Sequence, residues 1–467
     1  MASLCEAEPA APWRPKSEMR LPDAPDPFCD CFFHEGSRVS DATDEPLEIM
    51  KFLLVAALVS ATPIFASEPS TSTAATAINA LGIDLLRKAG GTDANALLSP
   101  YSIQSALAMT YAGADGVTRE EMRKVLHYPG DDSKVHGSFT ALRKALEGVV
   151  QESMTNAAQM KRWGATNDPI TLTVANRLFG QSGYDFRAPF LALVKDDYAA
   201  PFEPLDFVSD PVGAAKHIND WVEHQTRQRI RNLIPEDALD KLTRLVLINA
   251  IYVKAPWAEP FQTSATKPGP FHLNSGRSVD VPIMTQKQEL SYAKGDGFSA
   301  VQISYGGYQL GFLVLLPDKR SGLASLESKL TPGMLTGKAV KWESRDVTLY
   351  LPKFKLEPPM LPLSKKLQAL GMKSAFDQPL HSANFDRIAP RRPNDYLSIS
   401  EVFHKTFLNL DEQGTEAAAA MAIHVSTSGI HEPPKPIEVR VDHPFLFAVQ
   451  HLPSGACLFL GHVTDPR

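Results

Sequence analysis

Residues that could do catalytic chemistry are scattered through this chain and form no known catalytic arrangement. The sequence holds 13 histidines and four cysteines. It contains no Gly-x-Ser-x-Gly elbow, Walker loop, dinucleotide-binding glycine fingerprint or His-Glu-x-x-His zinc helix. His404 has apolar neighbours and Cys457 lies in the apolar run 456–460, so both are better explained as core side chains than as a base or a nucleophile. We therefore expect a protein that is not an enzyme and that needs no metal or cofactor.

The stretch from Gly414 to Pro436 has a different character: its residues suit a change in the structure of the chain itself and not catalysis. A turn-prone 411–414 leads into it and the proline-rich 432–436 closes it, as in a surface loop. Its residues nevertheless alternate like those of a half-buried strand. One predicted face carries Thr415, Ala417, Ala419, Met421, Ile423 and Val425, and the other carries Glu416, Ala418, Ala420, Ala422, His424 and Ser426. A loop with a strand pattern predicts a segment that can enter a sheet.

An amphipathic helix is the alternative for the four alanines 417–420, because alanine has the highest helix propensity. Glu416 is the only charged residue between Glu412 and Glu432, so an exposed helix here would lack a polar face. Small side chains also suit a strand that must slide between two existing strands. We therefore favour the strand.

Composition places the chain among globular proteins with a large core. Of its 467 residues, 43% are hydrophobic and 21% charged, and the formal net charge is −6. This balance, without blocks of like charge, argues against nucleic acid or an acidic membrane as the main partner. We expect a monomer.

The first 67 residues differ in composition from the rest. Residues 1–49 are rich in Pro, Asp and Glu and lack periodicity, so we interpret them as a disordered or mis-assigned extension. Met50 and Lys51 precede the apolar run 52–59 and the small residues 60–67, the three parts of a secretory signal. We expect translation to begin at Met50, cleavage near residues 66–67, and a single domain over 68–467. The protein would be secreted or extracellular, or periplasmic in a bacterium, and Cys457 would be its one cysteine.

Predicted helices come mainly before predicted strands. Helices are expected at 76–89, 101–111, 118–126, 138–154, 188–197, from 211, and at 363–370. Strands are expected at 172–179, 245–253, 300–303, 309–316, 347–351 and 402–410, with a hairpin at 445–460. Ser99 before Pro100, Thr118 and Asp210 are the predicted helix caps. Because βαβ alternation and internal repeats are absent from the sequence, the order indicates one α+β domain, with the apolar run 245–253 as a central strand.

Short motifs recur along the chain in an order and spacing typical of one protein family. They are Asn95-x-x-x-Ser99-Pro100-x-Ser102-Ile103, Ala106-Leu-Ala-Met109, Tyr111-Ala-Gly-Ala114, Leu247-Ile-Asn249-Ala-Ile-Tyr252, Trp257-x-x-Pro260-Phe261, Leu351-Pro-Lys-Phe354, His404-Lys405, the stretch 411–420, Asp442-His-Pro-Phe-Leu-Phe447 and Phe459-Leu-Gly461. Each is weak alone, but together they are specific. By these motifs the chain resembles the serpins from about residue 76 to residue 466.

The resemblance implies a serpin fold with three β-sheets, about nine helices and an exposed reactive-centre loop. It also implies an irreversible suicide-substrate inhibitor of serine endopeptidases. A protease attacks the loop and forms an acyl-enzyme, and the loop then inserts into the main sheet and distorts the protease. The uncleaved state of such a protein is metastable.

Residue roles carried over from the family fall into three groups. The hinge of the loop is Gly414, Thr415, Glu416, Ala417, Ala418, Ala419 and Ala420. The shutter, which controls opening of the sheet, and the breach, where the hinge enters, match Ser99, Ser102, Asn249, His404 and Trp257. Lys353 and Glu412 match a family ion pair, which contributes little if it is exposed.

The family spacing predicts the bond that the protease cuts. It lies roughly sixteen residues beyond the acidic residue Glu412, which gives the bond between Ser428 and Gly429. The loop is longer than in many relatives, so the predicted cut falls within 427–431. No Lys or Arg lies between Lys405 and Lys435, which excludes a trypsin-like target. A small residue at the cut favours an elastase-like or subtilisin-like protease.

Two alternatives remain open at this point. One is a non-inhibitory serpin that acts as a binding or chaperone-like module. Such proteins often carry bulky, charged or proline residues in the hinge, whereas 414–420 is composed of small residues apart from Glu416. The other is an inhibitor of cysteine proteases.

Overall fold

The computed structural model describes residues 70–88, 91–162, 168–416 and 435–467. These ranges all belong to one compact unit that spans 65–467. The expectations for the extension 1–49 and the signal 50–67 lie outside the described residues.

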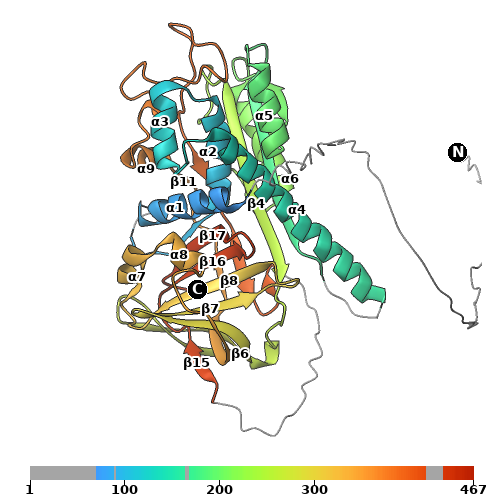
Figure 1. Cartoon of the computed structure of the whole chain (residues 1–467), viewed down its shortest axis with the longest axis vertical. Helices are drawn as coiled ribbons and strands as arrows, with labels where there is room; N and C mark the ends of the chain where they lie inside the picture. The colour runs from blue at the N-terminus through green and yellow to red at the C-terminus, as the bar shows by residue number, and fades with distance from the viewer. Residues whose placement is uncertain (1–69, 89–90, 163–167, 417–434) are drawn as a thin grey trace, which may run out of the picture. The chain divides into compact units, whose positions relative to one another are not determined.

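The described part of the chain contains nine α-helices, most of them in its first half (Figure 1). They are α1 Ser72–Lys88, α2 Pro100–Gly113, α3 Gly116–Val125, α4 Asp132–Arg162, α5 Ala188–Tyr198, α6 Pro211–Gln225, α7 Leu323–Lys329, α8 Pro332–Leu335 and α9 Ser364–Ala369, with 3₁₀ turns at Thr263–Ala265 and Ser374–Phe376. The predicted helices are therefore confirmed with shifted ends. None of the described helices has the length and apolar character needed to cross a bilayer.

Two of the three predicted helix caps are confirmed. The Ser99 hydroxyl accepts a hydrogen bond from the backbone N–H of Ser102 at the start of α2, and Asp210 accepts one from Gly213 at the start of α6. Thr118 was wrongly assigned as a cap, because α3 begins at Gly116. Its hydroxyl instead donates to the carbonyl of Ser382 at 3.3 Å and is buried. A tertiary contact has taken the place of the local one.

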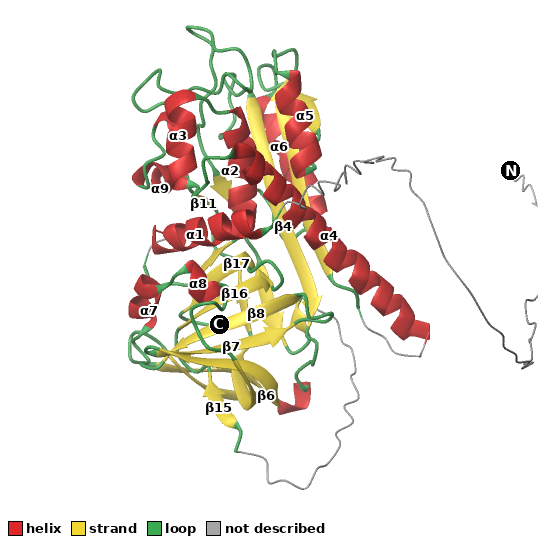
Figure 2. Cartoon of the chain, viewed as in Figure 1, coloured by secondary structure: helices red, strands yellow, loops and turns green. Residues whose placement is uncertain are grey.

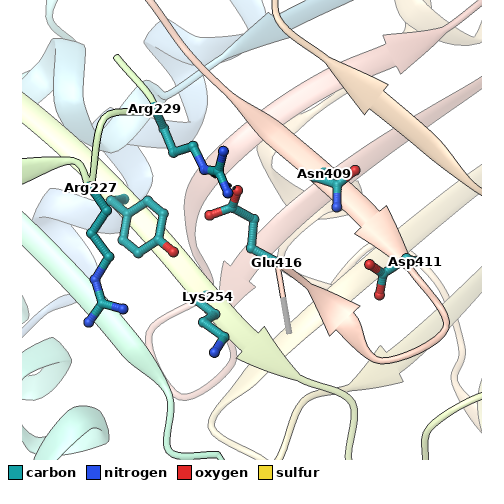
Figure 3. Close-up of a pocket in the computed structure, with 7 residues that line it drawn as sticks. Arg227, Arg229, Lys254, Asn409, Asp411 and Glu416 are labelled. Carbon is teal, nitrogen blue, oxygen red and sulfur yellow. Dashed lines mark ion pairs between the residues drawn. The ribbon is translucent and has the colours of Figure 1, made fainter. Parts of the chain in front are cut away.

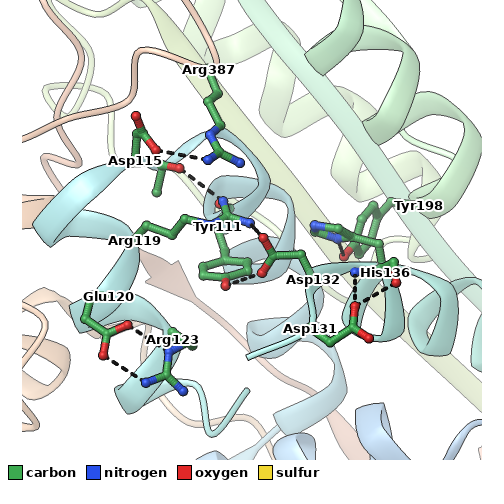
Figure 4. A network of polar contacts seen from close by, with 12 residues as sticks. Tyr111, Asp115, Arg119, Glu120, Arg123, Asp131, Asp132, His136, Tyr198 and Arg387 are labelled. Atoms are coloured by element: carbon green, nitrogen blue, oxygen red, sulfur yellow. Dashed lines mark hydrogen bonds and ion pairs between the residues drawn. The ribbon is translucent and has the colours of Figure 1, made fainter. Parts of the chain in front are cut away.

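A polar cluster fixes α2, α3 and α4 relative to one another (Figure 4). Arg119 of α3 donates to the carbonyl oxygens of Tyr111 at 2.7 Å and Ala114 at 3.0 Å, which cap the end of α2. The same guanidinium forms an ion pair with Asp132, the first residue of α4, and Asp132 also accepts from the Tyr111 hydroxyl. Burial, followed by that hydrogen bond, raises the pKa of Tyr111 to about 12.

A six-stranded sheet carries the beginning of the loop. Its strand order is β10 (Phe354–Leu356), β13 (Leu408–Asp411), β14 (Gly414–Thr415), β4 (Leu245–Pro256), β2 (Thr171–Gln181) and β3 (Phe202–Leu205). β2 and β4 are antiparallel from the pair Thr171–Lys254 to the pair Gly180–Leu245. The predicted central position of 245–253 is confirmed. Figures 1 and 2 show β4 running beside α2 and α6, with which it is in contact.

The continuous strand predicted for 402–410 was wrong. The chain forms β12 (Phe403–His404), which pairs with β11 (Leu361–Pro362), and only from Leu408 does β13 join the six-stranded sheet. Between them the Thr406 hydroxyl donates to the carbonyl of Leu97 at 3.1 Å. Here a side-chain hydrogen bond stands in place of backbone pairing between strands. A pattern of apolar residues cannot predict such a break in a strand.

A nine-stranded sheet completes the described part of the fold (Figure 2). Together with the six-stranded sheet and the β11–β12 pair it makes three sheets among the described residues, as predicted. Its order is β1 (Ala96–Leu98), β17 (Ala456–Val463), β16 (Phe445–His451), β8 (Leu310–Pro317), β7 (Phe298–Ser304), β6 (Ser278–Gly295), β9 (Glu343–Pro352) and β15 (Ile437–Arg440), with β5 (Lys267–His272) on β6. The predicted C-terminal hairpin is β16 and β17. β6 was missed because most of its residues are polar and partly exposed.

The two faces of the six-stranded sheet pack on two apolar clusters. On one face Ile251, Val253 and Ala255 of β4 join the main core with α1 and α2. On the other face Ile248 and Ala250 pack against α6 and the segment that connects it to β4. Covering both faces explains why β4 reads as a nearly continuous apolar run. The segment between α6 and β4 also lies next to Glu416, the residue that follows β14, because its Arg229 forms an ion pair with Glu416.

Candidate functional site

The first two residues of the predicted hinge already form a strand in the six-stranded sheet. Gly414 pairs with Asp411 of β13 and with Pro256 of β4, and Thr415 pairs with Leu410 and Ala255. The Thr415 side chain points into the core, as the alternating pattern predicts, and only 1% of the residue is exposed. The rest of the hinge, Ala417, Ala418, Ala419 and Ala420, and the predicted cut at Ser428 and Gly429 lie outside the described residues.

Gly414 occupies a position that excludes any side chain. Its φ is +143°, and a Cβ atom built there would lie 2.1 Å from the carbonyl oxygen of Ala255. Both the backbone conformation and the close approach to β4 therefore require glycine. The sequence motif and the strand pairing agree at this residue.

Trp257 lies directly beneath the hinge. Its ring is stacked on that of Tyr305, with 4.6 Å between the ring centroids. Its indole N–H donates to the carbonyl of Asp411, and its backbone N–H donates to the carbonyl of Gln413. The Tyr305 hydroxyl in turn lies 2.6 Å from that of Thr415. The end of β4 and the turn 411–414 are thus fixed by one buried aromatic pair.

Lys353 and Glu412 form the ion pair that the resemblance implied. The Lys353 ammonium lies 2.7 Å from Glu412, whose side chain is only 7% exposed. Burial raises the pKa of Glu412, but hydrogen bonds from Lys353 and Thr266 outweigh it, and the pKa is lowered overall. Because the carboxylate is buried, the pair is not of the weak exposed kind.

The predicted shutter residues are joined through backbone contacts at the start of α2. His404 accepts a hydrogen bond through Nε2 from the backbone N–H of Ser99 at 3.0 Å. The Ser102 hydroxyl donates to the carbonyl of Asn249 on β4 at 3.1 Å, and the Asn249 amide donates to Asn176 on β2. Burial lowers the pKa of His404 to about 4, so the ring is neutral at pH 7. The contacts tie α2 to the middle of the sheet.

Glu416 directly follows β14 and lines a polar cavity of about 380 Å³ (Figure 3). The cavity lies between the two strands that flank β14, since its lining residues come from β4, from β13 and from the segment after α6. They are Arg227, Arg229, Tyr252, Lys254, Asn409, Asp411 and Glu416. Among the strands that the structure describes, none pairs with this edge of β4 between Leu245 and Lys254.

Three residues in contact with the hinge or with Glu412 just before it were not found from the sequence. They are Tyr305, Thr266 and Arg229. No motif marks them, since each comes from a distant segment of the chain. One signal did exist for Arg229: the isolated charge of Glu416 on an otherwise uncharged stretch requires a partner if the segment enters a sheet.

Known proteins resemble the chain over most of its length. The family described as "Serpin (serine protease inhibitor)" matches residues 76–466. Leukocyte elastase inhibitor of Bos taurus is 37% identical over 80% of this chain and 93% of its own. An uncharacterized serpin-like protein of Thermococcus kodakarensis is 35% identical over 84% of this chain and 85% of its own.

A solved structure agrees with the fold as well. The structure titled "Cleaved Serpin 42Da" superimposes with a TM-score of 0.69 and 31% identity, covering 85% of this chain and 99% of its own. The family description names inhibition of serine proteases and not a catalytic activity. Motif order, sheet topology and the strand-forming hinge agree with these matches, and the chain belongs to the serpin family.

Proposed function

We propose that this serpin is a secreted, irreversible suicide-substrate inhibitor of serine endopeptidases. The observation that carries the proposal is β14. A loop that has begun a strand between β4 and β13, next to a cavity between the same two strands, is arranged to continue that strand. Secretion is proposed on the signal-like residues 50–67.

The proposed reaction uses the loop as a substrate. The serine hydroxyl of the protease attacks the carbonyl carbon of Ser428 and forms an ester, while the bond from Ser428 to Gly429 breaks and the proton passes to the new amine of Gly429. The freed hinge then extends β14 in the direction of the cavity. Insertion moves the ester-linked protease away from its docking position and distorts it before water hydrolyses the ester.

The side chains that follow Thr415 in the sequence suit this insertion. Ala417 and Ala419 would follow Thr415 on the face toward the core, where a larger or charged group would meet the packed residues of the sheet. The small residues stand in the sequence where the proposed insertion would begin. This feature favours inhibition over a purely binding role for the protein.

The target class is proposed from the loop sequence. A small residue at the cut fits a shallow primary pocket, as in elastase-like or subtilisin-like proteases, and no Lys or Arg is present for a trypsin-like one. One similar protein is named for inhibition of leukocyte elastase, which supports the same class.

The experiment is incubation of the purified chain with an elastase-like and, separately, a subtilisin-like protease. Denaturing gels and intact-mass spectrometry would follow the products. We expect a covalent complex that survives denaturation and a released peptide that begins at Gly429. Clean cleavage without a complex would overturn the proposal and favour a binding module.

A further inference from the structure

The carboxylate of Glu416 is buried where the chain leaves the sheet. The residue has φ +53°, a left-handed conformation that residues with a Cβ atom rarely adopt, so β14 stops at Thr415 and the backbone turns away. Its N–H donates to the carbonyl of Asn409 at 3.1 Å, which still belongs to β13. Its side chain is only 5% exposed. A charge in such a place is stable only when it is paired.

Arg229 provides that pairing from the segment between α6 and β4. Its Nε atom lies 2.6 Å from Oε1 of Glu416 (Figure 3). The guanidinium also lies 5.2 Å from the centre of the Phe407 ring, next to β13, while half of the Arg229 side chain is exposed. Burial, and then a hydrogen bond with Glu416, raises the pKa of Tyr252 on β4, so a third segment faces the same carboxylate.

We propose that Arg229 is a positioning residue of the hinge. Its ion pair with Glu416 holds the first two hinge residues in the sheet before any protease arrives. Without Arg229 the buried carboxylate of Glu416 has no cation beside it. Its free energy is then lower in water than in the sheet, and moving Glu416 to water also withdraws Thr415 from β14. Insertion after cleavage would then have to start from outside the sheet, and the acyl-enzyme would have more time to hydrolyse.

Arg227 offers a matched control on the same segment. It is two residues away, is exposed and lines the same cavity. Its guanidinium lies 5.6 Å from the centre of the Tyr252 ring and points away from Glu416 (Figure 3). No ion pair of Arg227 is found among the described residues. Removing either arginine changes the charge of the cavity equally, but only Arg229→Ala removes the partner of Glu416.

The first test needs no protease. Hydrogen–deuterium exchange of the hinge would be compared in the wild-type chain, Arg229→Ala, Arg229→Lys and Arg227→Ala. We expect exchange at Thr415 and Glu416 to be at least about fivefold faster in Arg229→Ala, intermediate in Arg229→Lys, and unchanged in Arg227→Ala. Equal exchange in Arg229→Ala and Arg227→Ala would overturn the proposal. Glu416→Gln tests the pair from its other side: adding Arg229→Ala to it should have no further effect.

The second test measures the partition between inhibition and turnover. This part of the inference rests on the proposed function. Arg229→Ala should raise the number of inhibitor molecules consumed per protease inactivated several-fold, while the rate of loop cleavage stays near wild type. An unchanged number would refute the effect on insertion. If even the wild-type chain forms no complex, the proposed inhibition fails, and the exchange experiment still decides whether Arg229 positions the hinge.

Discussion

The hydroxyl of Thr415 lies 2.6 Å from the hydroxyl of Tyr305, and both side chains are buried. Tyr305 is stacked on Trp257, so the hinge rests on an aromatic pair that is fixed at the end of β4. The contact shows that the uncleaved loop already has its first core-facing side chain in place. Burial raises the pKa of Tyr305 far above the physiological range, so the phenol stays neutral beside the threonine.

If the protein inhibits as proposed, Thr415→Arg is therefore expected to make it a substrate instead. A guanidinium at this position would have to be buried without a counter-charge, which costs several kcal/mol, on the order of 3–5. Gel analysis with an elastase-like protease should show cleaved chain and almost no covalent complex. Thr415→Ser keeps the hydroxyl and should inhibit like the wild type. Retained inhibition by Thr415→Arg would contradict insertion through this position.

Gly414→Ala tests the other residue of β14. The added methyl group would meet the Ala255 carbonyl at 2.1 Å in a backbone conformation of φ +143°, so the strand pair must open. We expect a loss of about 1–3 kcal/mol in the free energy of unfolding, measured by denaturant titration. Gly276→Ala is the control, because Gly276 also has positive φ but no atom within 4 Å of the added group. If both variants lose the same stability, the close approach to β4 is not important.

Lys353→Ala is expected to destabilise the protein more than an exposed lysine variant does. Among the described side chains, Glu412 would keep only Thr266 as a partner. A buried carboxylate without its cation costs about 1–3 kcal/mol here, given that Lys353 is partly exposed. Lys355→Ala is the control, since Lys355 pairs with Glu357 at the surface. Chemical denaturation of the two variants should differ by at least about 1 kcal/mol. A loss no greater than that of Lys355→Ala would mean that the Glu412 pair contributes little.

Acid should destabilise the protein through His404. Its pKa in the folded protein is about 4, against 6.5 for an ordinary histidine, because burial disfavours the charged ring. Between these values the unfolded chain binds a proton that the folded chain does not. The free energy of unfolding therefore falls as the pH drops from 6.5 to 4, by up to about 1.4 kcal/mol per pH unit.

His404→Gln isolates this contribution. The slope of unfolding free energy against pH between 4 and 6.5 should become shallower by about one proton relative to the wild type. Part of the slope should remain, because burial also lowers the pKa of His451 to about 4. The variant His451→Gln should then remove a comparable part. An unchanged slope in His404→Gln would show that the ring at the shutter does not titrate as described.

Local pattern was enough to predict the parts of the fold in which neighbouring residues decide the structure. The central strand β4, the C-terminal hairpin and the caps at Ser99 and Asp210 follow from apolar runs and from capping chemistry within a few residues. The family resemblance supplied the number of sheets, which no local pattern contains, but not the order of their strands. It also predicted a hinge at 414–420, and the structure places Gly414 and Thr415 in a strand.

The errors and omissions have a common physical cause. Thr118 and the break between His404 and Leu408 depend on hydrogen bonds to Ser382 and Leu97, which are far away in the sequence. The partner of Glu416 lies 187 residues earlier, at Arg229. Single-sequence reasoning can show that a charge needs a partner, but tertiary packing selects which residue provides it.

Cleavage of the loop is expected to raise the thermal stability of the protein. In the uncleaved chain β14 has two residues, and no described strand pairs with the edge of β4 between Leu245 and Lys254. After a cut within 427–431, the released hinge can extend β14 along that edge and satisfy backbone groups of both neighbours. We expect the melting temperature of the cleaved protein to rise by more than about 10 °C, measured by calorimetry on the intact and the nicked chain. Nicked Thr415→Arg is the control and should show a much smaller rise, because the charge blocks entry. An unchanged melting temperature in the nicked wild-type chain would mean that the loop does not insert, and the protein would then be a serpin that binds without trapping.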